Sequence, residues 1–130
     1  MSACDWLIEI RNRCTTELES IRHELDFYER HRSLCAEARI AALKEMQQRL
    51  LEEKLRLSNV FDLIPDPVAR AIYRWRYTTC GTWGLVAEKC GGMSERNAHY
   101  IHDHWLPEVE RLYKESTAPA AAVEYGERKE

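Results

Sequence analysis

Apolar positions in the first part of the chain recur at the spacing of one face of a helix. Residues 5–57 contain neither glycine nor proline and are dominated by residue types that form helices well. A first apolar stripe steps by three, four, three and seven residues: Leu18, Ile21, Leu25, Tyr28 and Cys35. A second stripe runs one residue out of phase with the first: Ala36, Ile40, Leu43, Leu50 and Leu57. This heptad pattern predicts a long helical, coiled-coil segment over residues 1–58.

The change of phase at His31–Cys35 is compatible with two structures. One is a discontinuity within a continuous coiled coil, and the other is a corner at which the helix folds back as a hairpin. A continuous helix of about 50 residues would be roughly 75 Å long and could not bury its own stripe. The continuous form therefore predicts a homodimer, whereas the hairpin permits a monomer. In either form we expect the segment to be a scaffold rather than a ligand site.

Residues 59–67 (NVFDLIPDP) interrupt the helical pattern and predict a linker. Pro65 and Pro67 disfavour helix at the residues that precede them. Asp66 is placed to cap the next helix, with Pro67 at its first position. The residues that follow carry apolar positions at helical spacing: Val68, Ile72 and Trp75. We therefore expect a compact helical domain over residues 68–114.

A glycine turn separates two further predicted helices. Thr82 is a natural cap for a short helix that ends at Cys90. Gly91 and Gly92 tolerate the positive φ that a sharp turn requires. Ser94 then caps a third helix. The apolar positions on these two helices are Leu85, Val86, Ala87, Ala98, Ile101 and Trp105.

The pattern weakens toward the end of the chain. Pro107 is a point at which the third helix ends, bends or restarts, and Val109 and Leu112 continue its apolar spacing. Residues 115–130 mix small and charged residues without an apolar stripe, which predicts a disordered tail.

The charge of the chain bears on whether it binds a polyanion such as nucleic acid. The net charge is −3, and charged residues make up 32% of the chain. Residues 1–64 carry 10 basic and 12 acidic groups, residues 65–114 carry 7 and 6, and residues 115–130 carry 2 and 4. The chain as a whole therefore offers no electrostatic attraction to a polyanion, and its middle part is only marginally basic.

The sequence also bears on where the protein is found. No apolar run approaches the roughly 18–20 residues needed to span a bilayer, and the start lacks the apolar core of a cleavable signal. We therefore expect a cytoplasmic protein with no membrane partner. The five cysteines stand at irregular spacings, which favours reduced thiols over a disulfide framework.

Residues 82–102 fit the pattern of a helix-turn-helix. That motif needs a small residue in its first helix, a glycine turn, a capping residue, and apolar residues four and seven positions beyond the cap. These requirements are met in order by Ala87, Gly91, Gly92, Ser94, Ala98 and Ile101. The chain is therefore predicted to be all-α, with a long N-terminal helix or helical hairpin followed by a compact helix-turn-helix domain.

On these residues the chain resembles a known class of regulators. Residues 60–113 are similar to region four of bacterial sigma factors, and the whole arrangement resembles the RinA and ArpU type phage late-transcription regulators. The positions that carry the likeness are Arg70, Ile72, Tyr77, Gly81, Trp83, Val86, Ala87, Ser94, Ala98, Ile101 and Leu106. One departure is that the span from Ala87 to Ser94 is one residue longer than is usual in such motifs.

The resemblance implies double-stranded DNA as the partner and the third helix as its recognition helix. Arg96 would then read guanine or grip phosphate, and Asn97 would pair with adenine. His99 and Tyr100 would add contacts to phosphates or base edges, and Ser94 would offer its hydroxyl to phosphate. The cations expected to touch the flanking DNA backbone are Lys89, Arg74 and Arg76. The alternative is a solvated helix face that needs no ligand, with Tyr100 packed on a neighbouring helix.

Other chemistries have weaker support. A zinc site would draw on His99, His102, His104, Cys80 and Cys90. No CxxC or HxxxH pair is present among them, so we expect no metal and no cofactor. No P-loop, dinucleotide-binding glycine pattern or catalytic-triad order occurs, so we do not expect an enzyme. The tryptophans of this region are expected to share one core: Trp75, Trp83 and Trp105.

Two functions follow from these observations. The first is a sequence-specific transcriptional regulator of phage or prophage origin, which dimerises through its N-terminal helices and binds two DNA half-sites. The second is a phage-encoded protein-binding module or inhibitor that uses the same fold to engage RNA polymerase or a host defence protein. The near-neutral charge of residues 65–114 favours the second.

Overall fold

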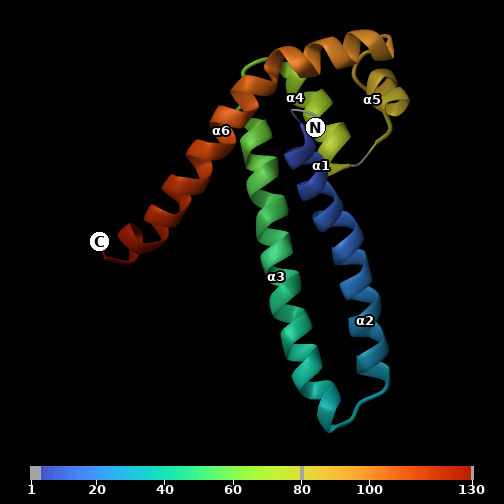
Figure 1. Ribbon diagram of the computed structural model, residues 1–130, viewed down its shortest axis with the longest axis vertical. Helices are drawn as coiled ribbons and strands as arrows, with labels where there is room; N and C mark the ends of the chain where they lie inside the picture. Colours follow the sequence, from blue (N-terminus) through green and yellow to red (C-terminus); the bar gives the residue numbers. More distant parts are fainter. Residues whose placement is uncertain (1–3, 80, 130) are drawn as a thin grey trace. The chain divides into compact units, whose positions relative to one another are not determined.

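The first part of the chain folds back on itself as a helical hairpin (Figure 1). The computed structural model describes the backbone of residues 4–79 and 81–129 and the side chains of residues 4–33, 35–79 and 81–116. Three segments form one uninterrupted helical rod: α1 (Asp5–Asn12), the π-helical η1 (Arg13–Glu17) and α2 (Leu18–Arg30). After a short loop, α3 (Leu34–Asp62) returns beside α2.

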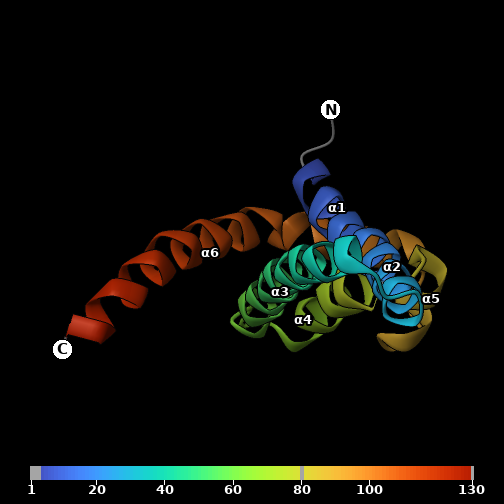
Figure 2. The same ribbon diagram turned by 90° about the horizontal axis from the view of Figure 1, so that it is seen from below.

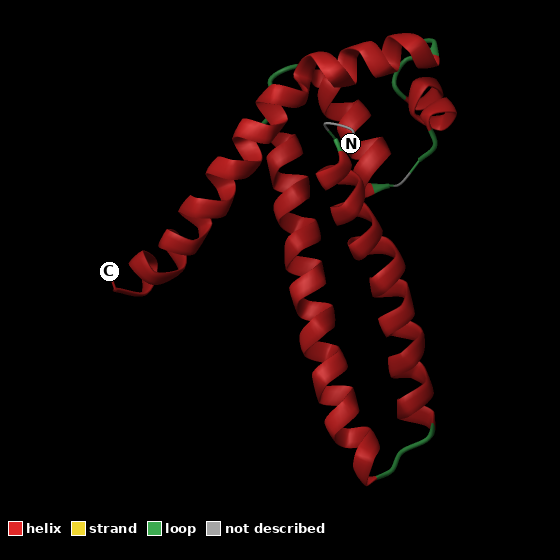
Figure 3. Ribbon diagram, in the orientation of Figure 1, coloured by secondary structure: helices red, strands yellow, loops and turns green. Residues whose placement is uncertain are grey.

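The chain divides into two compact units, Met1–Leu55 and Arg56–Glu130. Throughout the described residues the regular structure is helical, and no strand occurs there (Figure 3). The predicted all-α class is therefore confirmed. Among the described helices, none has an apolar stretch sufficient to cross a lipid bilayer.

The corner of the hairpin lies where the apolar stripe changes phase. His31 leaves the helical backbone conformation with φ −122° and ψ 65°. Ser33 then starts α3, because its hydroxyl oxygen accepts a hydrogen bond from the backbone N–H of Ala36 at 3.3 Å. Of the two structures compatible with the sequence, the hairpin is the one observed, and the continuous coiled coil is wrong.

The two apolar stripes face each other across the hairpin. Their buried members form one core: Ile21, Leu25, Ala36, Ile40 and Leu43. Tyr28 and Leu50 pack against this core. The stripes differ in phase because α2 and α3 run in opposite directions and each turns its own apolar face inward. Since the hairpin buries its stripe without a second copy, this pattern no longer requires a homodimer.

The second unit begins with the last turns of α3 and continues through four further helical segments. These are α4 (Pro67–Tyr73), η2 (Arg74–Thr78), α5 (Trp83–Lys89) and α6 (Glu95–Lys129). A fully buried aromatic pair joins the first two of them, since the ring centroids of Phe61 on α3 and Tyr73 on α4 lie 5.4 Å apart. The core of this unit therefore starts where the hairpin ends.

Each of these α-helices begins at a capping residue that the sequence predicts. The side-chain oxygens of Asp66, Thr82 and Ser94 each accept a backbone N–H three residues later, at 2.8, 3.3 and 3.1 Å. Such bonds satisfy donors that the first turn of a helix leaves unpaired. Arg70 holds the linker from the other side by donating from Nε to the carbonyl oxygen of Ile64 at 3.1 Å. The start of α4 is thus fixed by local chemistry.

The last helix, α6, is continuous in Figure 2, and its sequence includes Pro107. Proline removes one hydrogen bond from a helix interior, but the apolar stripe beyond it keeps α6 in contact with the core. Val109 is fully buried and Leu112 is 9% exposed. The helix extends to Lys129 and so includes residues 115–129, which belong to the segment for which the sequence predicts disorder. Side chains from residue 117 onward lie outside the described part of the chain.

The turn between α5 and α6 depends on two glycines in succession. Gly91 has φ +110° and Gly92 has φ +69°, both in the range that favours glycine. Two backbone bonds close the turn, from Gly92 N–H to the Glu88 carbonyl at 3.2 Å and from Met93 N–H to the Ala87 carbonyl at 3.1 Å. The predicted positive φ at both glycines is confirmed.

Replacement of Gly91 by alanine is expected to destabilise the second unit by about 1–3 kcal/mol, because φ +110° strains any residue that has a Cβ. Urea unfolding of the two proteins would measure the change. A matched control is Gly84→Ala inside α5, where the new Cβ would meet only the mobile end of the Glu95 side chain at 3.2 Å. That control should gain roughly 0.5–1 kcal/mol. Equal effects at both glycines would contradict the assigned turn geometry.

Candidate nucleic-acid interface

The first turns of α6 are fixed against α5 by a small apolar core. Its buried members are Ile72, Val86, Ala87 and Ala98. Around them pack the half-buried side chains of Trp75, Trp83, Cys90, Met93 and Ile101. Ala87 and Ala98 are small enough to let two helices approach closely. The predicted packing of these two alanines and of Ile101 is therefore confirmed.

Polar and aromatic side chains cover the opposite side of the same turns. Arg96, Asn97, His99 and Tyr100 are exposed, whereas Ala98 between them is fully buried. Tyr100 is 68% exposed, which is high for a large aromatic residue. Arg96 and Tyr100 are four residues apart and so lie one above the other on the helix surface. The structure thus brings these four predicted contact residues together on the outer side of one helix start.

Two of these side chains also contact neighbouring rings. The His99 ring lies with its centroid 3.8 Å from that of Trp83 on α5, at an interplanar angle of 32°. The Tyr100 ring stacks on that of His104, with centroids 6.3 Å apart. His99 therefore lies at the edge of the α5–α6 contact, while Tyr100 points away from α5 into solvent.

The hydroxyl of Ser94 is used inside the helix start. It accepts from the backbone N–H of Asn97 at 3.1 Å. That bond leaves the backbone N–H groups of Glu95 and Arg96 as the donors that a helix N-terminus presents outward. The Asn97 amide nitrogen lies 3.8 Å from the sulfur of Met93, a weak contact that a base edge can displace.

The cations predicted to contact the flanking DNA backbone differ in their interactions within the protein. Arg74 pairs with Asp62, and its Nε lies 3.1 Å from that carboxylate. Arg76 donates to the carbonyl oxygen of Gly81 at 3.1 Å, and its guanidinium lies 4.9 Å from the ring centroid of Trp83. Both side chains are therefore engaged with the second unit itself. Lys89 is exposed at the end of α5.

A buried histidine lies directly beneath this surface. His102 is 1% exposed, and its Nδ1 lies 2.9 Å from a carboxylate oxygen of Asp103. Its Nε2 lies 2.7 Å from the hydroxyl oxygen of Tyr77. Because a carboxylate only accepts, this network places the hydrogen on Nδ1 and makes Nε2 the acceptor from Tyr77. His102 therefore connects α6 to η2.

Aromatic rings enclose His102 on its remaining sides. The Tyr73 ring stacks on it at 4.7 Å and 14°, and the Tyr73 hydroxyl donates to the His102 carbonyl oxygen at 2.6 Å. Trp83 meets it edge-on at 5.3 Å. Burial lowers the pKa of His102 below its usual value, and this effect outweighs the opposing influence of Asp103. The imidazole is therefore neutral at pH 7.

From the sequence alone, His102 is a candidate only for metal binding. The signal for its structural role was its spacing, because His102 stands four residues after Ala98 and three before Trp105, on the apolar side of the helix. Across the described residues no group of His, Cys, Asp or Glu side chains is arranged to hold a metal ion. Cys80, one of the candidate ligands, lies outside the described residues.

The predicted shared core of tryptophans is correct for two of the three residues. Trp75 and Trp83 pack against the core between α5 and α6. Trp105 is half-buried further along α6, where its ring meets that of His104 edge-on at 5.7 Å. Cys90 is half-buried beside the same core, and burial raises the pKa of its thiol, which makes it a poor nucleophile.

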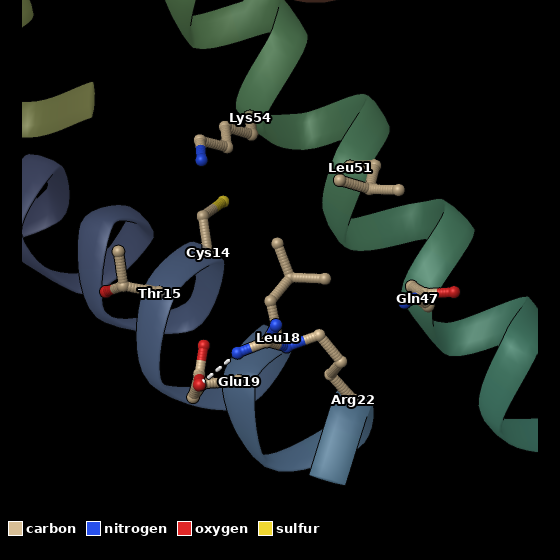
Figure 4. Close-up of a pocket in the computed structure, with 8 residues that line it drawn as sticks. All are labelled: Cys14, Thr15, Leu18, Glu19, Arg22, Gln47, Leu51 and Lys54. Carbon is tan, nitrogen blue, oxygen red and sulfur yellow. Dashed lines mark hydrogen bonds and ion pairs between the residues drawn. The ribbon is translucent and has the colours of Figure 1, made fainter. Parts of the chain in front are cut away.

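The hairpin carries a separate groove between α2 and α3 (Figure 4). Its volume is about 310 Å³, and it is lined by Cys14, Thr15, Leu18, Glu19, Arg22, Gln47, Leu51 and Lys54. Glu19 and Arg22 pair with each other along its edge. Cys14 is buried and its thiol contacts the carbonyl oxygen of Leu50 at 3.7 Å. Since both signs of charge line this groove, it is not a surface that attracts a polyanion.

No family model, curated protein or solved structure matches this chain. Function therefore has to be inferred from the residues of the site themselves. The beginning of α6 combines a helix start packed on a core, a capping serine and exposed polar side chains.

Proposed function

We propose that this chain is a sequence-specific regulator of transcription, of phage or prophage origin, that reads double-stranded DNA with the first two turns of α6. The single observation that carries this proposal is the exposed group Arg96, Asn97 and Tyr100 on a helix start that is fixed to α5 through a glycine turn. A helix presented in this way fits the major groove of DNA. The resemblance to sigma region four supports the same function.

Each residue of this surface has a role that its chemistry suits. The Arg96 guanidinium matches the paired acceptors of guanine, and the Asn97 amide matches adenine. Tyr100 is long and exposed enough to reach a phosphate or a thymine methyl group. The backbone N–H groups of Glu95 and Arg96 face a phosphate at the amino terminus of the helix. Base reading thus depends on a few adjacent side chains.

Dimerisation in this proposal uses exposed leucines of α3, of which Leu51 also lines the groove in Figure 4, rather than the buried stripes of the hairpin. Leu51 and Leu55 lie one turn apart on α3 and are 46% and 61% exposed. A symmetric pair of hairpins covers these leucines and presents two copies of α6 to successive half-sites. Light scattering of the purified protein measures the mass, for which this proposal expects a dimer.

Selection from a pool of random DNA duplexes tests the proposed function. Protein-bound duplexes are recovered, amplified and sequenced over several rounds at low salt. The proposal expects enrichment of one short motif, repeated as two half-sites. Recovery that stays uniform across the pool, or no recovery at all, would count against a sequence-specific regulator.

The salt dependence of binding follows from the few cations on this surface. Among the described side chains, the predicted cationic contacts that are exposed and form no ion pair are Arg96 and Lys89. Two neutralised phosphates give a slope of about −2 for the logarithm of affinity against the logarithm of salt, per protomer. Fluorescence anisotropy with the enriched duplex measures it. A slope steeper than about −5 would mean that other cations carry the binding.

A protein-binding module remains the second candidate, and one observation favours it. Most arginines of the described second unit are engaged within the unit, including Arg70, Arg74, Arg76 and Arg111. A surface with so few available cations and an exposed Tyr100 also suits a protein partner such as RNA polymerase or a host defence protein. In that case the random-duplex selection yields no motif, and Tyr100→Ala weakens capture of the protein partner.

A further inference from the structure

We propose that His102 is a proton-sensitive latch, which holds the first turns of α6 in place through Tyr77 and Asp103 while it is neutral and loosens them when it takes up a proton. The link to DNA reading rests on the proposed function. The latch itself is a property of the fold and is tested without DNA. His102 is the buried polar side chain of the described core, at 1% exposure.

The hydrogen-bond pattern around His102 fits a neutral ring. Neutral imidazole has one donor and one acceptor. Nδ1–H donates to Asp103 at 2.9 Å, and Nε2 accepts from the Tyr77 hydroxyl at 2.7 Å. A second proton would convert Nε2 into a donor that faces the hydroxyl hydrogen of Tyr77. Tyr77 must then turn its hydrogen away and accept from Nε2 instead, while the positive charge is enclosed by the rings of Tyr73, Tyr77 and Trp83.

Charged and titratable groups from the neighbouring elements act on His102 in opposite directions. Asp103, on the same helix, favours the protonated ring, but it is 74% exposed and its influence is screened by water. Arg76 on η2 and His99 on α6 oppose protonation. The hydroxyls of Tyr73 on α4 and Tyr77 on η2 face the ring and its backbone, and α5 contributes the uncharged Trp83. Burial is the largest influence, and it also opposes protonation.

A displacement of His102 is transmitted to the outer surface of α6 through direct side-chain contacts. Trp83 contacts His102 edge-on at 5.3 Å and contacts the exposed His99 ring at 3.8 Å. His102 also stands one turn after Ala98, the residue that packs α6 onto α5. Displacement of the imidazole therefore shifts both Trp83 and the helix turn that carries Asn97, His99 and Tyr100.

The direction of the pH effect follows from the lowered pKa of His102. The folded protein resists protonation, whereas the unfolded chain takes up a proton near the ordinary value of 6.5. Unfolding therefore binds a proton below that pH, and stability falls as the pH drops from 6.5 toward the folded pKa. Above 6.5 the contribution of His102 is fully present.

Nitrogen-15 NMR of the histidine rings, combined with thermal unfolding from pH 8 to pH 5, tests the latch. We expect His102 to carry its hydrogen on Nδ1 and to have a pKa below the ordinary value of 6.5. The wild-type midpoint should fall on acidification below pH 6.5, and His102→Gln, which cannot be protonated, should flatten that fall. His104→Gln on the exposed side of α6 is the matched control and should leave the fall unchanged.

A second variant keeps the test valid if His102→Gln does not fold. Tyr77→Phe removes the hydroxyl that contacts Nε2, so it should change the pH at which His102 titrates. The latch is wrong if the pKa of His102 is at or above the ordinary value of 6.5, or if Tyr77→Phe leaves its titration unchanged. None of these readouts involves DNA, so a failure of the latch is distinguishable from a failure of the DNA-binding proposal. If the wild type binds an enriched duplex, its affinity should fall between pH 8 and pH 5. The fall should be smaller for His102→Gln than for the wild type.

Discussion

Replacement of Phe61 by alanine is expected to lower the free energy of unfolding of the second unit by about 3–5 kcal/mol. Phe61 is fully buried, and its ring contacts those of Tyr73 at 5.4 Å and Tyr77 at 6.1 Å. Its loss leaves a cavity beside the two tyrosines that bond to His102. Since a whole domain is stable by only about 5–15 kcal/mol, this is a large share of the total.

Urea unfolding followed by tryptophan fluorescence measures this change. Leu63→Ala is the matched control, because Leu63 is two residues away and 61% exposed. The control should change the unfolding free energy by no more than about 0.5 kcal/mol. Similar losses at both positions would contradict the assignment of Phe61 to the centre of this core.

Replacement of Arg96 by alanine is expected to weaken binding to the enriched duplex by about 1–3 kcal/mol, or roughly 5- to 150-fold. The loss should be confined to duplexes that carry guanine at one position of the motif, because a guanidinium pairs with two acceptors of that base. Arg96→Lys should not restore the discrimination, since an ammonium group lacks the paired donors. Fluorescence anisotropy with the motif and with single-base variants measures both effects.

Lys114→Ala is the matched control for Arg96→Ala. Lys114 is also an exposed cation on α6, but it lies 18 residues further along, which is about 27 Å on a helix. Its loss should leave both affinity and base preference unchanged. Thermal unfolding should show no difference between the two variants, because neither side chain is buried. A uniform loss on all sequences in Arg96→Ala would assign Arg96 to phosphate rather than to a base.

Features that depend on local chemistry were predictable from the sequence. The caps at Asp66, Thr82 and Ser94 and the positive φ of Gly91 and Gly92 follow from what single side chains and single backbone positions can do. Helical spacing likewise placed Ala87, Ala98 and Ile101 on the packed side of α5 and α6. These elements do not depend on a distant part of the chain.

Features that depend on distant contacts were not predictable. The change of phase at residues 31–35 fitted both a continuous coiled coil and a hairpin, and the choice depends on whether Ile21 and Leu25 find Ile40 across the corner. The engagement of Arg74 required knowing that Asp62 lies within reach. The continuation of α6 through Pro107 similarly depends on buried residues beyond it, such as Val109.

His102 shows that the role of a candidate site residue can be assigned only when its contacts in the folded chain are known. As a sequence element it belonged to a group of histidines that raised the question of zinc. In the folded chain both of its ring nitrogens are used by Tyr77 and Asp103. Its spacing relative to Ala98 indicated burial, but no pattern in the sequence could name Tyr77, 25 residues earlier, as its partner.

The most direct test of the account is to map where DNA contacts the protein. Nitrogen-15-labelled protein is titrated with the enriched duplex at low salt, and backbone amide shifts are followed by NMR. We expect the largest changes at the amides of Glu95, Arg96 and Asn97 and in the turn that follows them, with little change along the hairpin. Shifts concentrated on the hairpin, or no shifts with any duplex at low salt, would contradict the claim that the start of α6 reads DNA.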